Sequence, residues 1–251
     1  MSNAPETSPT SATLSQPLLG RTALITGASR GIGHALAYEF ASQGADLFLL
    51  ARTVGGLEEI HDEIKAKFPE RKVTLIANDL TNFSDMEALG PAIASKVDKL
   101  DIWVANAGMM STMGPLAHGK FKEFQKVMDT NVTANYQLIR TLDPLLKNSD
   151  AARVIFVTSG AAEKGRAYWG AYSVSKAALE QLASIYAAEN DITNINVNVI
   201  NPGQTRTAMW QEAFPGREPE EVPPASEIVH KFVELALPSC TLNGAYINAQ
   251  D

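Results

Sequence analysis

Two side chains with the chemistry for proton transfer lie four residues apart in this sequence, Tyr172 and Lys176. In a helix that spacing puts both on one face, one turn apart. An unperturbed tyrosine has a pKa of about 10, and bringing that pKa near neutrality needs roughly 4 kcal/mol. A cation about 5 Å away supplies roughly 3 kcal/mol at an effective dielectric constant near 20. We therefore expect Lys176 to lower the pKa of Tyr172 in a general acid–base pair, unless the two form only a half-buried ring beside a surface amine.

The composition is that of a globular protein with one large α/β domain. The chain has 251 residues, of which 45% are hydrophobic and 20% charged, and it is long enough to bury a full core. Its net charge of −7 disfavours binding to nucleic acid or to an acidic membrane surface. The single cysteine, Cys240, permits no internal disulfide and favours a reducing compartment, so we expect a cytoplasmic protein. The sequence has no apolar run of about 18 residues and no signal-peptide pattern, so no membrane span is expected.

Apolar runs and stretches of helical periodicity alternate along the chain after a polar beginning. Residues 1–16 are rich in Ser, Thr, Pro and Ala, which predicts a disordered tail, and residues 17–251 predict a folded domain. Strands are expected at residues 22–26, 47–51, 73–77, 101–105, 154–158, 195–200 and 245–247. Helices are expected at residues 32–44, 57–68, 84–97 with Ser84 as the cap, 121–146 in two segments meeting near Asn131, 171–189 and 225–237.

Continuous apolar strands that alternate with helices are typical of a parallel sheet covered on both faces. The predicted fold class is therefore α/β, a single-domain doubly wound parallel sheet, or Rossmann fold. Such sheets bind ligands at the carboxyl ends of their strands. The residues that follow each predicted strand are therefore the candidates for a ligand site.

Three glycines occupy the junction between the first strand and the first helix, Gly27, Gly31 and Gly33. Glycines there permit a tight turn and a close approach of backbone to a pyrophosphate, which the helix N-terminus attracts. A simple turn needs only one glycine, so the Gly-x-x-x-Gly-x-Gly spacing favours dinucleotide binding. The predicted cofactor contacts in this loop are Gly27, Ser29, Arg30, Gly31, Ile32 and Gly33.

The end of the second strand indicates which dinucleotide binds. An acidic residue there would bond the ribose 2′-hydroxyl of NAD, whereas an arginine accommodates the 2′-phosphate of NADP. This chain has Ala51 followed by Arg52, and Asp46 lies at the far end of the strand, roughly 16 Å away. Arg30 supplies a second cation in the glycine loop. We therefore predict NADP(H) as the cofactor, with NAD(H) as the alternative.

The glycine loop and the Tyr-x-x-x-Lys pair together resemble the motifs of the short-chain dehydrogenase/reductase family. Further landmarks follow in the family's order, Asn78-Asp79-Leu80 after the third strand, Asn106-Ala107-Gly108 after the fourth and Asn201-Pro202-Gly203 after the sixth. The resemblance begins near Leu18 and covers the rest of the chain, with Ala105 as a departure where the family usually has Asn. Segments 165–172 and 201–215 also resemble a bacterial subgroup of uncharacterised oxidoreductases.

The resemblance implies an oxidoreductase that moves a hydride between a nicotinamide and a carbonyl or secondary alcohol. Tyr172 would protonate the carbonyl oxygen, and Lys176 would hold the nicotinamide ribose and lower the pKa of Tyr172. Ser159 would hydrogen-bond the substrate oxygen, and Asn131 would position a water between Lys176 and solvent. The other implied cofactor contacts are Asp79, Leu80, Asn106, Ala107, Gly108, Tyr172, Lys176, Pro202, Gly203, Thr205 and Thr207.

Apolar side chains near these motifs predict a largely apolar substrate pocket, partly under a mobile lid after Pro202. The candidates are Met109, Met110, Met113, Arg166, Tyr168, Trp169, Met209, Trp210 and Phe214. The leading hypothesis is an NADPH-dependent carbonyl reductase that acts on a 3-oxoacyl thioester or a related ketone. The alternatives are an NAD-dependent alcohol or sugar dehydrogenase and a non-catalytic nucleotide-sensing protein.

The expected partners are a small-molecule substrate and a second copy of the chain. Members of the family dimerise through the helices that correspond to residues 121–146 and 171–189, so the resemblance implies a homodimer or homotetramer. No metal site is predicted, because the four histidines show no ligand spacing.

Overall fold

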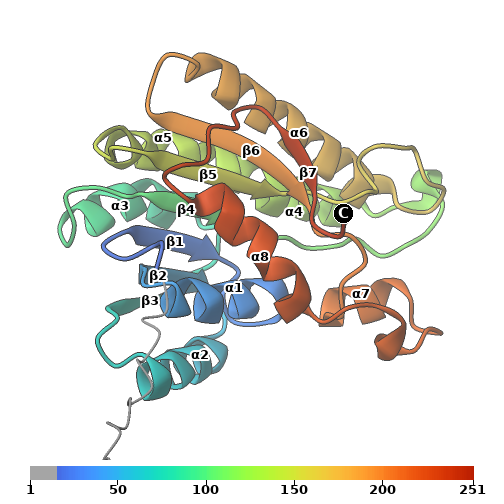
Figure 1. Cartoon of the computed structure of the whole chain (residues 1–251). Helices are drawn as coiled ribbons and strands as arrows, with labels where there is room; N and C mark the ends of the chain where they lie inside the picture. Colours follow the sequence, from blue (N-terminus) through green and yellow to red (C-terminus); the bar gives the residue numbers. More distant parts are fainter. Residues whose placement is uncertain (1–15) are drawn as a thin grey trace, which may run out of the picture.

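The computed structural model describes residues 16–251, which form a central seven-stranded sheet with helices on both faces (Figure 1). Every neighbouring pair of strands is parallel, and the order across the sheet is β3-β2-β1-β4-β5-β6-β7. The strands are β1 Thr22–Thr26, β2 Asp46–Ala51, β3 Val73–Ala77, β4 Ile102–Ala105, β5 Ala152–Val157, β6 Ile195–Asn201 and β7 Tyr246–Asn248. The predicted doubly wound parallel sheet is confirmed, and the strand order reverses between β1 and β4, where such sheets bind ligands.

Except for α7, which was not expected, the helices fall close to the ranges expected from the sequence. They are α1 Gly31–Ser42, α2 Val54–Lys67, α3 Phe83–Ala94, α4 Phe121–Met128, α5 Ala134–Lys147, α6 Gly170–Glu189, α7 Ala208–Ala213 and α8 Ala225–Ala236. Short helical turns occur at η1 Leu116–His118, η2 Asp129–Thr133 and η3 Pro219–Glu221. Within residues 16–251, no helix is both long enough and apolar enough to cross a bilayer.

Alternate residues of each strand point into two separate apolar layers. Ile25 of β1 packs with α1, α2 and α8 on one face of the sheet. Its neighbour Leu24 packs with α3, α5 and α6 on the other face. On that second face the rings of Trp103 and Phe156 meet edge to face, with their centroids 5.2 Å apart. Burial of both faces explains why the strands are continuous apolar runs.

Three local features differ from or refine the sequence expectations. Ser84 does not cap α3, because the helix begins at Phe83 and the carbonyl of Asn82 already accepts the first helical bond, from the Met86 N–H at 3.1 Å. The expected break near Asn131 is confirmed as the π-helical turn η2 between α4 and α5. The expected tail at residues 1–16 lies, apart from Gln16, outside the described residues.

The segment after Pro202, expected as a lid, contains the six-residue helix α7. Thr207 begins this helix, and its side-chain oxygen accepts a hydrogen bond from the Trp210 N–H at 3.1 Å. That bond satisfies one of the N–H groups that the first turn of a helix leaves free. The element is thus a helix docked beside the carboxyl ends of the strands.

Candidate active site

The loop between β1 and α1 has the shape of a phosphate-binding turn. Gly27 and Gly31 have φ angles of +70° and +59°, in the left-handed region that favours glycine. A Cβ atom on Gly33 would lie 2.6 Å from the Asn106 Nδ2 atom and still closer to the Gly27 carbonyl oxygen. The side chain of Arg30, which precedes α1, makes no capping hydrogen bond. The first N–H groups of α1 are therefore available to an anion, which fits a dinucleotide pyrophosphate.

The segment after β4 holds this glycine loop through hydrogen bonds. The Asn106 Nδ2 atom donates hydrogen bonds to the carbonyl oxygens of Thr26 at 2.9 Å and Gly27 at 3.3 Å. The Ala107 N–H donates to the Thr26 hydroxyl at 3.0 Å. Asn106 and Ala107, expected as cofactor contacts, therefore bond the loop that faces the cofactor position, and the Asn106 amide is already engaged.

The end of β2 presents an exposed cation next to the glycine loop. The Arg52 guanidinium lies 3.8 Å from the Asp79 carboxylate, and the two side chains are 59% and 43% exposed. Such exposed pairs contribute little to stability, so this arginine remains free to exchange partners. Asp79 also accepts hydrogen bonds from the N–H and hydroxyl of Thr81, at 2.9 and 2.8 Å, and Leu80 is buried in the core. Arg30 is exposed at the start of α1.

Tyr172 and Lys176 lie one turn apart on α6, and both side chains are buried. The Lys176 Nζ atom donates a 2.8 Å hydrogen bond to the Val157 carbonyl at the end of β5. The same atom would lie 3.4 Å from a Cβ placed on Gly108, so glycine at that position leaves room for the ammonium. From there, Nζ is 5.9 Å from the centroid of the Tyr172 ring. The predicted pair is therefore present, with the amine directed toward the carboxyl edge of β5.

Burial controls the pKa values of this pair. It raises the pKa of the Tyr172 phenol above its ordinary value, and a hydrogen bond with Ser159 only partly opposes the effect. Burial lowers the pKa of the Lys176 ammonium to about 8, and the Glu180 carboxylate opposes that shift. The expectation that Lys176 lowers the pKa of Tyr172 is wrong for this structure. The phenol is almost fully desolvated, while the ammonium points at the Val157 carbonyl.

Asn131 is fully buried in the π-helical turn and its side chain is fully used. Its Oδ1 atom accepts from the Met109 N–H at 2.9 Å, and its Nδ2 atom donates to the Met109 carbonyl at 3.0 Å. The Nδ2 atom also donates to the Ser175 hydroxyl at 2.9 Å. This side chain thus joins the segment after β4 to α6 one residue before Lys176. The predicted catalytic asparagine therefore lies in the site, where its side chain hydrogen-bonds Met109 and Ser175.

Ser159 follows β5, and its hydroxyl accepts a hydrogen bond from the Ala161 N–H at 3.3 Å. Next to it, Asn201 joins two loops, because its Oδ1 atom accepts from the N–H of Gly160 at 3.2 Å and of Gly203 at 3.0 Å. Sequence reasoning did not give Asn201 a role, although its place directly before the Pro-Gly pair was a signal. The predicted residues Pro202 and Gly203 are therefore fixed beside the predicted serine.

The glycine loop and the segment after β6 also meet. The methyl group of Thr207 would lie 3.2 Å from a Cβ placed on Gly31. Thr205 is buried, and its hydroxyl donates to the Pro202 carbonyl at 3.1 Å. The structure thus brings the predicted pyrophosphate loop and the predicted nicotinamide segment to one edge of the sheet.

Aromatic rings pack directly against Tyr172. The Trp169 ring centroid lies 6.0 Å from that of Tyr172 and 5.8 Å from that of Phe214, which follows α7. The partly buried side chains of Met110 and Met209 pack against the same cluster. Of the substrate-facing candidates, these four therefore form one cluster with Tyr172.

Tyr168 does not join this cluster. Its ring is 60% exposed, and its φ of +75° makes it the one non-glycine residue in the left-handed region among residues 16–251. Its carbonyl accepts a hydrogen bond from the Gly114 N–H at 3.1 Å. This strained turn places Trp169 inside the cluster and Tyr168 outside it.

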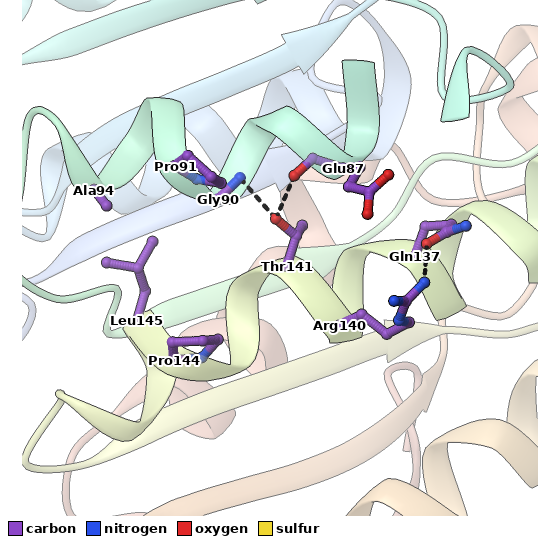
Figure 2. Close-up of a pocket in the computed structure, with 9 residues that line it drawn as sticks. All are labelled: Glu87, Gly90, Pro91, Ala94, Gln137, Arg140, Thr141, Pro144 and Leu145. Carbon is purple, nitrogen blue, oxygen red and sulfur yellow. Dashed lines mark hydrogen bonds between the residues drawn. The ribbon is translucent and has the colours of Figure 1, made fainter. Parts of the chain in front are cut away.

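Tyr172 does not line either of two cavities in the described structure. One of about 380 Å³ lies between α3 and α5, where Thr141 bonds the Gly90 N–H and the Glu87 carbonyl (Figure 2). None of the predicted site residues lines it, so it carries no part of the candidate chemistry. A second, of about 340 Å³, lies between the segment after β4, α4 and the start of α6, next to Tyr172 in the chain.

Among residues 16–251, no three His, Cys, Asp or Glu side chains gather as a metal site.

This chain is similar to known proteins both in sequence and in structure. A family model described as short chain dehydrogenase matches residues 21–218. The uncharacterised oxidoreductase YciK of Escherichia coli is 36% identical over 216 residues, covering 86% of this chain and 85% of that protein. A 3-oxoacyl-[acyl-carrier-protein] reductase of rhamnolipid biosynthesis from Pseudomonas aeruginosa is 36% identical over 198 residues, covering 76% of this chain and 75% of that protein. A crystal structure of a short chain dehydrogenase from Shigella flexneri, complexed with NADP, has a TM-score of 0.91 and 33% identity, covering 94% of this chain and 100% of that one.

The matched range contains the glycine loop, the Tyr172–Lys176 pair and the Pro202–Gly203 segment. The likeness in structure covers 94% of this chain. The resemblance inferred from the motifs is thereby confirmed. The chain belongs to the short-chain dehydrogenase/reductase family and is an NAD(P)-dependent oxidoreductase of carbonyl or alcohol groups.

Proposed function

We propose that this protein is an NADPH-dependent reductase of ketones that carry an apolar substituent, with 3-oxoacyl thioesters as the first class to test. One observation carries the proposal: the buried Tyr172 phenol packs against a wall of aromatic and methionine side chains. A tyrosine hydroxyl carries a proton at neutral pH and can donate it to a carbonyl oxygen. An apolar wall suits an apolar group beside that carbonyl.

The roles we assign follow from the positions of the side chains. Tyr172 donates its proton to the carbonyl oxygen of the substrate, and the Ser159 hydroxyl donates a hydrogen bond to the same oxygen. Lys176 keeps a positive charge beside the site and binds the ribose hydroxyls. Asn131 positions the segment after β4 against α6. When bound, the nicotinamide cofactor supplies the hydride.

The preference for NADP(H) is part of the proposal. It is supported by the exposed Arg52 at the end of β2 and by Arg30 in the glycine loop. Ala51, where an NAD-binding protein has its acidic residue, is buried and apolar. The relative from Shigella flexneri was crystallised with NADP. The neighbouring Asp79 pairs with Arg52 only weakly, so a 2′-phosphate can displace it.

The experiment has two parts, binding and turnover. The dissociation constants of NADPH and NADH are measured by fluorescence titration, and NADPH is expected to bind at least about tenfold more tightly. NADPH oxidation is then followed with a panel of 3-oxoacyl thioesters, aryl ketones and short polar ketones. We expect turnover of the apolar ketones. Tighter NADH binding would refute the cofactor assignment, and turnover of the polar ketones alone would refute the substrate class.

We further propose that the protein is a homodimer or homotetramer. Large apolar side chains are exposed on α4, α5 and α6, among them Phe121 at 72%, Tyr136 at 51% and Ile185 at 48%. These are the helices through which the family dimerises, and exposed apolar patches mark interaction surfaces. Sedimentation should give a dimer or larger assembly, with dissociation in Ile185→Glu. A monomer at micromolar concentration would contradict the proposal.

A further inference from the structure

The segment that follows β7 returns to the site described above. Strands β6 and β7 pair in parallel with Asn201 opposite Asn248, so both end at the same edge of the sheet. Beyond them, the Ala249 N–H donates a 2.9 Å hydrogen bond to the Asn201 carbonyl, and Ala249 is buried. These contacts place Gln250 beside the residues that follow β6.

The Gln250 side-chain amide binds two carbonyl groups of that segment. Its Nε2 atom donates hydrogen bonds to the Pro202 carbonyl at 3.0 Å and to the Gln204 carbonyl at 2.8 Å. Gly203 lies between these two carbonyls with a φ of +70°, and a Cβ placed on it would lie 2.5 Å from the Gln250 Cδ atom. One amide thus holds both sides of a glycine, and the absence of a side chain on Gly203 lets it do so.

This contact adds to the Asn201 and Thr205 hydrogen bonds in restraining a stretch of backbone that contains glycine. Gly203 and Gln204 are both exposed, and glycine has the largest choice of backbone conformations. Thr205 and Thr207 follow at once, and Thr207 reaches across to Gly31 of the pyrophosphate loop. The conformation at Gly203 therefore decides where the segment lies relative to the glycine loop.

We propose that Gln250 is a positioning residue for the nicotinamide half of the cofactor, acting through the backbone of Pro202, Gly203 and Gln204. The proposal rests on the proposed function, because it assigns these residues to nicotinamide binding. Gln250 itself touches neither substrate nor cofactor in this account. Its amide holds two carbonyls in the orientation in which their neighbours contact the nicotinamide.

The test compares two ligands that share the adenosine half of the cofactor. NADPH carries the nicotinamide, whereas adenosine 2′,5′-bisphosphate lacks it. The variant Gln250→Leu keeps nearly the size of the side chain and removes both donors. We expect NADPH to bind about three- to tenfold more weakly to Gln250→Leu, with bisphosphate binding unchanged within about twofold. Asp251→Asn, which alters an exposed neighbour bonded to Asn248, is the matched control and should leave both affinities unchanged.

Two results would overturn the proposal. If Gln250→Leu binds NADPH as the parent protein does, the amide does not position the nicotinamide. If it loses affinity for both ligands equally, the contact supports the fold generally. A parent protein that prefers NADH would count against the proposed cofactor instead, and the same comparison is then made with NADH and AMP.

Discussion

At the scale of single residues, Lys176 is a charge that the fold buries at a cost. Its ammonium donates to the Val157 carbonyl, and no carboxylate of residues 16–251 lies within 4.0 Å of it. Burial lowers the pKa of Lys176 from 10.5 to about 8, which measures how strongly the site disfavours the charge. A residue kept despite such a cost points to function, because proteins trade stability for activity at their active sites.

This cost makes a prediction about stability and pH. Lys176→Met should raise the free energy of unfolding at pH 7 by about 2 kcal/mol, the pKa shift less one lost hydrogen bond. Between pH 8 and 10.5 the unfolded protein holds the proton that the folded protein has released, so the parent protein gains stability as the pH rises. The advantage of the variant is therefore full below pH 8, shrinks as the pH rises and reverses near pH 10.5, where only the lost hydrogen bond remains.

Urea denaturation of both proteins at pH 7 and pH 10 checks this prediction. Other titrating groups contribute equally to both proteins, so their effects cancel in the difference between the two free energies of unfolding. A variant that is less stable at pH 7, or a difference that stays constant with pH, would show that burial of the charge is not costly.

Residue chemistry was only partly predictable from the sequence. The spacing of Tyr172 and Lys176 predicted their shared helical face, because that depends on local geometry alone. Their pKa values depend on burial, which several distant elements produce together, and the predicted direction for Tyr172 was wrong. Gln250 went unnoticed because only the pairing of β6 with β7 brings it to Pro202.

At the scale of elements, the turn into α1 tests whether the glycine loop is built for close approach. Gly33→Ala should weaken NADPH binding by more than about tenfold and lower the melting temperature, because its Cβ would collide with the loop. Gly55→Ala, in α2, is the matched control, since a Cβ there meets nothing within 4 Å. Because alanine has a higher helix propensity than glycine, Gly55→Ala in the first turn of α2 should leave stability unchanged or slightly raised. Equal behaviour of the two variants in calorimetry and titration would contradict the account of the turn.

The side chain of Arg217 packs against the short helix α7. The Arg217 guanidinium binds the Glu221 carboxylate at 2.6 Å and the Gln204 side-chain oxygen at 2.9 Å. Its Cζ atom also lies 5.6 Å from the Trp210 ring centroid and 5.8 Å from that of Phe214. Arg217 therefore joins α7 and Phe214 to Gln204 of the segment after β6.

Loss of the Arg217 contacts should weaken binding of the substrate more than binding of the cofactor. Arg217→Ala is expected to raise the KM for an apolar ketone about three- to tenfold while changing the KM for NADPH less than about twofold. Arg140→Ala, an exposed arginine of α5 that bonds Gln137, serves as the control in the same steady-state assays. An unchanged ketone KM in Arg217→Ala would mean that α7 does not shape the substrate side of the site.

Most elements were predictable, and the exceptions have physical causes. The strands are long apolar runs buried on both faces, so their positions stand out in the sequence. Helix α7 has six residues, too few to show a helical period, and a bond from Trp210 to Thr207 defines its start. The turn at Tyr168 has no glycine to signal its positive φ, and the surrounding fold must impose it.

At the scale of the whole molecule, the parallel sheet explains why distant segments form one site. All seven strands end at the same edge, and the chain returns there after β1, β4, β5, β6 and β7. The segments that follow these five strands contribute, in order, the glycine loop, Asn106 that bonds this loop, Ser159, the Pro202–Gly203 pair and Gln250. The fold class was predictable because this arrangement follows from alternation of strands and helices, whereas the contacts between returning segments were not.

The most direct test of the central claim is single-turnover oxidation of bound NADPH by the best apolar ketone, comparing Tyr172→Phe with the parent protein. The variant removes the hydroxyl group, and with it the transferable proton, but keeps the ring that packs on Trp169. We predict that the rate falls by at least about 10²-fold while the affinity for NADPH changes less than about twofold. A variant that keeps a rate within about threefold of the parent would contradict the assignment of Tyr172 as the acid.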